Sequence, residues 1–295
     1  MILSALERCP LCHSQKIALY KKGTVQPEKI SAADFKITDS HYGSRWTFFI
    51  CRACAFVFAN PAPAQGEIER FYAALADDEY SQEDAGRGRN FTAILKRLHP
   101  FAPAEAPLLD VGAASGIFLN LAKNAGYRVT GIEPSAALVA DAERLYGLKL
   151  FCGTVEQFKS SEKFAVVTLL DVLEHVTDPG ALLAALNGFL APGAMLVIVT
   201  PDISSLAARA MGGRWWHYRI AHIHFFNLSS LTWLLEKNGF EIVLRKRFAW
   251  NFSLYYLLTR LWPAGKGSAL QKPLKKLHCK LQLFDSWEIY ARKKN

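Results

Sequence analysis

The chain lacks the features that would place it across a membrane or outside the cell. No apolar run reaches the ~18 residues that a membrane-spanning helix needs. The first eight residues do not join a basic segment to a long apolar stretch, as a secretory signal does. We find no internal repeat and no low-complexity tract. Because 51% of the residues are hydrophobic, the sequence predicts a globular protein with a full core, and we expect it to be cytoplasmic.

Most of the chain also lacks net charge. Residues 1–240 carry 23 Lys/Arg and 23 Asp/Glu, whereas residues 241–295 carry 12 Lys/Arg and 3 Asp/Glu. The whole excess of +9 is therefore C-terminal. Such a region favours an anionic neighbour, namely nucleic acid, phospholipid headgroups or a phosphorylated substrate. The alternative is a basic surface that only keeps the protein soluble.

Cysteine is scarce, with six residues, but four of them form two close C-x-x-C pairs. The four are Cys9, Cys12, Cys51 and Cys54. In a chain that is not secreted, this spacing indicates metal binding, and four thiolates suit a structural, tetrahedral zinc ion. The 38 residues between the pairs exceed the usual ribbon loop, so we expect a hairpin or small sheet there. His13 and His41 are alternative ligands, which we rank below the all-cysteine set.

Three blocks follow one another along the chain. Residues 1–60 form the zinc module, residues 61–105 a helical connector and cofactor cover, and residues 106–295 the main domain. Within the connector, the charged, glycine-containing stretch 77–90 predicts a loop or mobile cover.

The main domain alternates strands and helices. The predicted strands are Pro107–Val111, Tyr127–Ile132, Leu148–Cys152, Phe164–Leu170 and Ala194–Thr200. The predicted helices are Gly116–Ala125, Ser135–Tyr146, Thr154–Lys159, Pro179–Leu190 and Ser229–Asn238. Short apolar strands separated by helices predict an α/β fold whose parallel sheet is covered on both faces.

The alternation changes after residue 200. Phe240–Trp250 and Leu283–Arg292 are predicted as two late strands joined by one connection, which indicates a reversed final strand. Between them, residues 251–282 form an apolar and then basic insertion. We expect the stretch 248–282 to form either an interfacial helix pair on an anionic membrane or a lid over the substrate.

A glycine-containing loop leaves the first strand of this domain and enters a helix, in the run Leu108–Gly116. Glycine lets the backbone approach a ligand, and a helix N-terminus offers free N–H groups. Glu133 ends the next strand, where a carboxylate can accept both hydroxyls of a ribose. NAD is the alternative cofactor, but Ala114 occupies the position where a dinucleotide fingerprint has its second glycine.

Five ordered segments then resemble class I S-adenosylmethionine (SAM) dependent methyltransferases. They are Asp110-x-Gly112-x-Ala114-x-Gly116, Glu133, Gly153-Thr154, Asp171–Pro179 and Leu190–Leu196. The resemblance implies SAM as methyl donor and a Rossmann-like, seven-stranded, mostly parallel sheet whose last strand is antiparallel. Farther upstream, Phe56–Pro63 with Ile68, Phe71, Tyr72 and Tyr80 resembles bacterial methyltransferases that carry an N-terminal zinc ribbon. Some members of that subgroup act in sugar, polysaccharide or secondary-metabolite pathways.

The resemblance also implies roles for individual residues. Gly112 and Gly116 would line the methionine part of SAM, and Asp110 would orient the loop and reach the amino group. Glu133 would hold the ribose. Thr154 and Val155 would flank adenine, and Asp171 would close the pocket. Ala114, in place of a glycine, narrows the loop.

A histidine-rich segment follows the fifth strand, at Trp215–Asn227, near the carboxyl ends of the strands where open α/β sheets bind ligands. Histidine titrates near neutrality and accepts protons. We predict His222 or His224 as the base or acceptor-orienting group. The alternative is that these histidines cap a helix or fill the core.

The sequence thus predicts a SAM-dependent methyltransferase that acts on a small-molecule, sugar, glycan or lipid-linked acceptor, by O- or C-methylation. An RNA methyltransferase that docks through the zinc module and the basic region is the first alternative. Against it, residues 1–60 are not notably basic, and no Asn/Asp-Pro-Pro-Tyr tetrad follows the fourth strand. A non-catalytic module that binds zinc and SAM is the second alternative. For its location, we expect the cytoplasm, with peripheral contact to the inner membrane face.

Overall fold

The computed structural model describes residues 1–36, 43–75, 84–261, 274 and 276–294, and its centre is one seven-stranded sheet with the order β12-β15-β10-β9-β6-β7-β8. Five of the strands are β6 (Pro107–Val111), β7 (Arg128–Glu133), β8 (Phe151–Cys152), β9 (Phe164–Leu170) and β10 (Leu190–Pro201). The last two are β12 (Phe240–Arg247) and β15 (Ser286–Lys293). The sheet is parallel except for β15, which pairs antiparallel with both β10 and β12. The predicted α/β class, the seven strands and the antiparallel last strand are confirmed.

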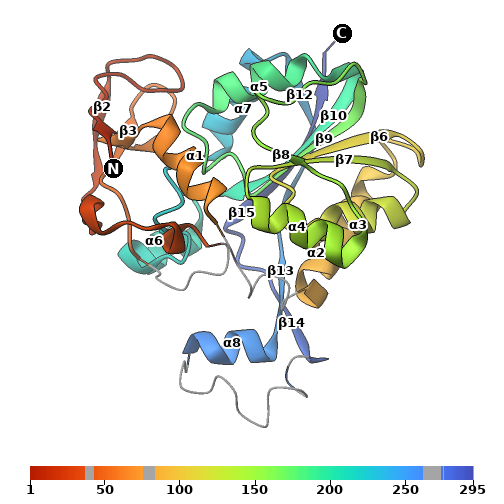
Figure 1. Cartoon of the computed structure of the whole chain (residues 1–295). Coiled ribbons are helices and arrows are strands. Elements are labelled where there is room, and N and C mark those ends of the chain that lie inside the picture. Colours follow the sequence, from red (N-terminus) through yellow and green to blue (C-terminus); the bar gives the residue numbers. More distant parts are fainter. Residues whose placement is uncertain (37–42, 76–83, 262–273, 275, 295) are drawn as a thin grey trace.

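Helices cover both faces of the central sheet (Figure 1). Figure 1 shows α5 (Pro179–Asn187) and α7 (Leu228–Lys237) on one face, and α2 (Asp84–Leu98), α3 (Ile117–Asn124) and α4 (Ala136–Tyr146) on the other. Successive side chains of each strand point to opposite faces of the sheet, so every strand contacts both helix layers. In β10, Leu196 and Ile198 pack with α5 and α7, whereas Met195 and Val197 pack with α2 and α3. This burial on both faces explains why the strands read as continuous apolar runs.

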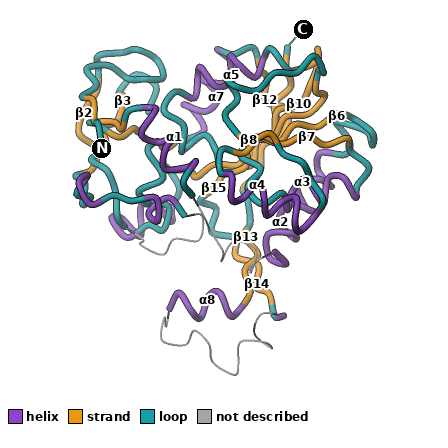
Figure 2. Tube along the Cα trace, viewed as in Figure 1, coloured by secondary structure: helices purple, strands orange, loops and turns teal. Residues whose placement is uncertain are grey.

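The N-terminal residues build a second, four-stranded sheet of order β11-β4-β3-β2. Its strands are β2 (Ile17–Lys21), β3 (Phe48–Cys51), β4 (Val57–Ala59) and β11 (His224–Phe225). Figure 2 shows this sheet beside the central one. The expected small sheet between the cysteine pairs is present, and its fourth strand comes from the histidine segment.

Shorter elements complete the fold. They are β1 (Leu3–Ser4), β5 (Ala62–Pro63), α1 (Gln65–Ala73), α6 (Leu206–Met211) and the 3-10 turns Pro27–Lys29, Ala32–Phe35 and Gly212–Arg214. The insertion contains β13 (Trp250–Ser253), α8 (Leu254–Leu261) and β14 (His278–Leu281), with β13 and β14 paired antiparallel. Within the described residues, no helix is both long and apolar enough to cross a membrane.

Three local predictions were wrong. Thr154–Lys159 was predicted as a helix but forms a single turn, in which the Phe158 N–H donates to the Thr154 carbonyl at 3.1 Å. So short a segment gains too few backbone hydrogen bonds to offset the cost of starting a helix. The stretch 77–90 is helical from Asp84 onward, while residues 76–83 lie outside the described residues. The strand predicted over Phe240–Trp250 is two strands, β12 and β13. In the insertion, the described residues hold the β-ribbon of β13 and β14 and the helix α8.

Candidate functional site

The loop between β6 and α3 is held in an open conformation by unusual backbone angles. Gly112 has φ +73°, Ala114 +48° and Gly116 +80°. A Cβ at Gly112 would lie 2.8 Å from Cγ2 of Val172, so glycine is required there by space as well as by conformation. The N–H groups of Gly112 and Ala113 both donate to the Ile132 carbonyl, which fastens the loop to β7.

Glu133, at the end of β7, binds the backbone of this loop. Its Oε2 accepts the Ala114 N–H at 2.9 Å, and its Oε1 accepts the Ser135 N–H at 2.9 Å. Burial raises the pKa of Glu133 to about 7, although these two backbone hydrogen bonds oppose the shift. Each carboxylate oxygen keeps a second lone pair, so the group can accept two further hydrogen bonds.

Asp110 and Gly116 support the loop from behind. Asp110 is buried, and its Oδ1 accepts the Thr168 hydroxyl at 2.5 Å, which ties β6 to the neighbouring β9. Burial raises the pKa of Asp110 to about 7. Gly116 is the N-cap of α3, and a Cβ there would meet Leu148 and Ala142 at 3.1 and 3.2 Å. Neither residue lines the cavity described next.

A cavity of about 630 Å³ opens in front of the loop, at the carboxyl ends of β6, β7 and β9. Six of the eight residues predicted to bind the cofactor line it: Gly112, Ala114, Glu133, Thr154, Val155 and Asp171. Asp171 has φ +56°, and burial raises its pKa to about 6 against the opposing charges of His217, Arg87 and Arg219. The structure therefore gathers residues from four separate segments around one space.

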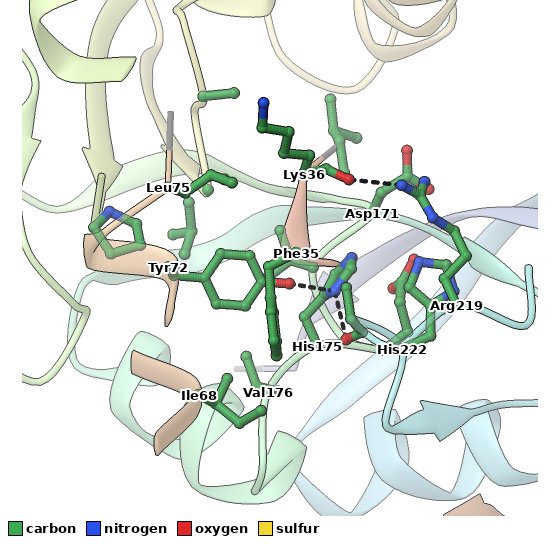
Figure 3. A pocket seen from close by; sticks show the side chains of 18 of the residues that line it. Phe35, Lys36, Ile68, Tyr72, Leu75, Asp171, His175, Val176, Arg219 and His222 are labelled. Atoms are coloured by element: carbon green, nitrogen blue, oxygen red, sulfur yellow. Dashed lines mark hydrogen bonds between the residues drawn. The ribbon is translucent and has the colours of Figure 1, made fainter. Parts of the chain in front are cut away.

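A tyrosine and two histidines meet on the wall of this cavity (Figure 3). The Tyr72 hydroxyl lies 2.6 Å from Nδ1 of His175, and the same nitrogen lies 2.9 Å from the Ala221 carbonyl. A carbonyl only accepts, so the second contact is satisfied when Nδ1 carries the proton, which leaves Nε2 as the basic atom of the ring. The His222 ring packs edge-on against His175, with centroids 4.7 Å apart.

Burial keeps both histidines neutral. It lowers the pKa of His175 to about 4 and that of His222 well below its ordinary value. Burial also raises the pKa of Tyr72 far above its ordinary value, so the phenol stays protonated. At neutral pH, both rings are therefore uncharged and each keeps one nitrogen lone pair, while the low pKa makes them weak bases.

The two histidines predicted from the sequence fall in different places. His222 lines the cavity. His224 does not: its Nε2 lies 3.1 Å from the Thr177 carbonyl, and its ring packs 5.0 Å from Phe56. His175 and the Tyr72 hydroxyl, which also lie at this cavity, were not among the bases predicted from the sequence. The signal was present in both motifs, Phe71-Tyr72 and Glu174-His175, but only the fold brings them together.

The N-terminal residues form part of the cavity wall. Phe35 and Lys36 line it, and Phe35 stacks on Phe71 with centroids 4.8 Å apart. The Arg219 guanidinium donates to the Lys36 carbonyl at 2.6 Å, as Figure 3 shows, and the Trp46 indole donates to the Ile220 carbonyl at 2.7 Å. With the β4–β11 pairing, these bonds fix the histidine segment to the cysteine-bearing sheet.

The four paired cysteines form one cluster, in which every sulfur lies within 4.8 Å of the others. The Sγ–Sγ distances are 3.7 Å for Cys9–Cys54 and 3.5 Å for Cys12–Cys51. Four sulfurs around a tetrahedral zinc, each at ~2.3 Å, would be about 3.8 Å apart. The His41 alternative lies outside the described residues.

Each cysteine pair has the same backbone geometry. The residue after the pair, His13 or Ala55, has φ +59° and donates its N–H to the carbonyl of the first cysteine at 2.9 Å. A backbone N–H lies 3.4 Å from the first sulfur in each case, from Leu11 to Cys9 and from Ala53 to Cys51. Two matching turns that aim four thiols at one point fit a metal ion.

Comparisons with known proteins agree with this geometry. The strand order and the cavity at the carboxyl ends of the strands define the class I SAM-dependent methyltransferase fold. A family model described as "Methyltransferase domain" matches residues 83–245, more than half of the chain, so the chain belongs to this methyltransferase family.

Individual relatives share parts of the chain. A ubiquinone biosynthesis O-methyltransferase of Rhodopseudomonas palustris is 35% identical over 99 residues, which cover 32% of this chain and 39% of the relative. A ubiquinone biosynthesis O-methyltransferase of Bradyrhizobium sp. is 34% identical over 99 residues, which cover 32% of this chain and 39% of that relative. These matches thus span about two fifths of the relatives' length.

Among solved structures, the Burkholderia thailandensis 1,6-didemethyltoxoflavin-N1-methyltransferase aligns with a TM-score of 0.51 at 18% identity. The alignment covers 83% of this chain and 98% of that one, and it supports the fold.

Proposed function

We propose that the protein transfers a methyl group from SAM to a hydroxyl group of a small-molecule acceptor. The observation that carries the proposal is the Tyr72–His175–His222 cluster, which shares one cavity with Glu133 and the β6–α3 loop. The partial relatives named for O-methylation in ubiquinone biosynthesis support a hydroxyl acceptor. Sugar, glycan and lipid-linked acceptors belong to the same proposal.

In this proposal, SAM is held at the loop end of the cavity. Glu133 accepts the ribose hydroxyls, Gly112 and Ala114 leave room for the methionine part, and Thr154 with Val155 flanks the adenine. Asp110 and Gly116 act indirectly by fixing the loop. SAM, when bound, supplies a methyl group already activated on a sulfonium.

The protein's own contribution is to position the acceptor and to receive its proton. The acceptor oxygen would bond to the methyl carbon as the methyl–sulfur bond breaks and S-adenosylhomocysteine leaves, while the acceptor proton passes to Nε2 of His175. The Ala221 carbonyl and the Tyr72 oxygen hold the protonated Nδ1 and thereby fix the ring. His222 packs against that ring and orients the acceptor. Of the two predicted bases, the geometry favours His222 over His224, and it adds His175.

The experiment compares His175→Gln with His99→Gln, an exposed position on the connector after α2. We measure transfer of labelled methyl from SAM to the solvent-extractable molecules of a cell extract, together with the affinity for S-adenosylhomocysteine. His175→Gln should lower the rate by about 10²-fold or more, as loss of a general base does. It should leave the affinity within twofold, whereas the control should match wild type in both. A wild-type rate in His175→Gln would show that His175 is not the base.

For the cysteine cluster, we propose a structural zinc ion. The sulfur distances and the matched turns support it. The hydrogen bond between Cys9 and Cys54 lowers the pKa of Cys9 and raises that of Cys54, as for two thiols that share one proton. Because the zinc-bearing sheet includes β11, the metal would stabilise the wall of the acceptor site and not a separate docking module.

The expected peripheral contact with an anionic membrane also remains a proposal. Residues 250–281 contain six Lys/Arg and no Asp/Glu, and Leu258 and Leu277 are 46% and 54% exposed. Sedimentation with phosphatidylglycerol vesicles at low salt tests it, with phosphatidylcholine vesicles as control. Equal sedimentation with both lipids, or none with either, would contradict an electrostatic contact.

A further inference from the structure

The cavity does not end at the histidine cluster. It continues toward the arm, a name that we use for the described elements β13, α8 and β14 alone. Figures 1 and 2 show β13, β14 and α8 extending away from the two sheets. Six uncharged residues in or next to the arm line this end: Trp250, Phe252, Tyr256, Leu257, Leu281 and Leu283. Trp250 also lies beside Arg87 and Asp171, so the uncharged residues begin at the charged part of the cavity and continue from there along the arm.

The aromatic residues among these form a continuous series along the arm. The Trp250 and Phe252 rings lie 6.0 Å apart with an angle of 11°, and those of Phe252 and Tyr256 lie 5.1 Å apart with an angle of 8°. Phe248 meets Trp250 edge-on at 4.8 Å, which joins the series to the body. We call Trp250, Phe252 and Tyr256 the aromatic track.

Alternation along β13 fixes which side chains face the cavity. Asn251 lies between two track residues and is bound by Asn90 of α2, whose Oδ1 accepts its N–H at 2.9 Å and its side-chain amide at 2.6 Å. Asn251 also packs closely against Gly86 of α2. A Cβ at Gly86 would lie only 2.6 Å from the Asn251 carbonyl oxygen, so glycine permits this contact. The base of the arm is thus attached to α2 through its polar side, and its apolar side is left for the cavity.

We propose that the acceptor carries a linear apolar chain, and that this chain lies along the aromatic track while the reactive hydroxyl reaches His175. The inference rests on the proposed function and names its substrate class. A sugar chain would bring hydroxyls that need hydrogen-bond partners, whereas these walls consist mainly of carbon. Flat stacked rings and leucines instead give an alkyl or prenyl chain continuous dispersion contacts and remove its surface from water.

The test is a binding experiment that does not require the true acceptor. The full chain is saturated with S-adenosylhomocysteine, so that the cofactor end is filled, and is then titrated with a pyrene-labelled fatty acid. Straight-chain alcohols from hexanol to dodecanol compete for the probe. We expect the affinity of the alcohols to rise about threefold to fourfold with each added methylene, as for a chain that becomes buried.

Two neighbouring leucines on α8 provide matched variants. Leu257 lines the cavity, whereas Leu258 is 46% exposed and does not. Leu257→Asp should weaken probe binding at least tenfold, because it places a carboxylate against the chain. Leu258→Asp should bind the probe within twofold of wild type.

The outcomes separate this inference from the proposed function. Affinity that does not change with alcohol length, equal effects of Leu257→Asp and Leu258→Asp, or displacement by maltohexaose in place of the alcohols would overturn the apolar-chain site. In each case, retained binding of S-adenosylhomocysteine would leave the methyltransferase proposal standing. Loss of that binding in the wild-type chain would instead contradict the proposed function.

Discussion

The buried carboxylate of Glu133 makes a specific prediction about how cofactor affinity changes with pH. Burial places its pKa at about 7 in the free protein. The proposed ribose contact needs the ionised form, because only that form accepts on both oxygens. Binding must therefore remove the proton at any pH below 7. The cost is about 1.4 kcal/mol, or about tenfold in affinity, for each pH unit below 7.

The expected curve follows from the sign of this shift. The pKa of Glu133 is higher in the folded protein than in the unfolded chain, where it is 4.5. Cofactor affinity is thus full above pH 8 and falls as the pH decreases through 7, to roughly a tenth at pH 6. For the free protein, the same shift makes the folded state bind the extra proton between these two pKa values. The contribution of Glu133 to stability therefore falls as the pH rises through that window.

The assay is calorimetric titration with S-adenosylhomocysteine at several pH values, on wild type and on Glu133→Gln. In the variant, an amide N–H₂ replaces one of the oxygens that accept from Ala114 and Ser135. One buried N–H then loses its acceptor, at a cost of about 1–3 kcal/mol. We expect weaker binding at pH 8, with no pH slope near 7.

Glu156→Gln serves as the control, because Glu156 is an exposed carboxylate on the wall of the same cavity. It should keep both the affinity and the slope of wild type. A wild-type affinity that is constant from pH 6 to pH 8 would refute the assignment of Glu133 to the cofactor.

Three further predictions concern the acceptor site, the metal and the fold. Tyr72→Phe removes a hydroxyl that lies 2.6 Å from His175, and should lower kcat severalfold with unchanged affinity for S-adenosylhomocysteine; a wild-type kcat would contradict the positioning role. Cys54→Ser should lower bound zinc from one ion per chain to a small fraction in elemental analysis and lower the melting temperature; full zinc content in this variant would contradict the four-cysteine site. Arg97→Ala should destabilise the protein by about 3 kcal/mol in urea unfolding, because its bidentate partner is buried. Arg128→Ala, which loses an exposed ion pair and an exposed hydrogen bond to the Glu105 carbonyl, should cost less than Arg97→Ala, and equal costs would contradict the reasoning.

Most strands of the central sheet were predictable from the sequence because each follows a local apolar pattern. β9 begins and ends where the apolar run Phe164–Leu170 does. Glu133 and the glycine loop were also readable, since they follow two strands whose carboxyl ends must lie at the same edge. Such features depend on neighbours in sequence or on parallel pairing alone.

What escaped prediction depends on contacts between distant segments. Tyr72 and His175 are 103 positions apart, and their hydrogen bond exists only because α1 packs beside the end of β9. Likewise, His224 resembled a base in the sequence, but its pairing with Phe58 turns it away from the cavity and into the N-terminal sheet. A single sequence carries no pattern for a strand pairing of that kind.

The arm shows the same limit. Its apolar and basic composition indicated a membrane helix pair or a lid. The structure adds that β13 and β14 form a ribbon, and that Asn90 of α2 binds the base of this ribbon at Asn251. Composition identified the region, whereas the alternation of β13 determined which side chains face the cavity.

The central claim is that the cavity joins SAM to a small-molecule acceptor. The most direct test is to incubate the protein with methyl-labelled SAM and a host extract, and then to separate RNA, protein and solvent-extractable molecules. The account predicts label in the extractable fraction, and loss of that label in His175→Gln. Label in RNA or protein, in wild type and variant alike, would contradict it.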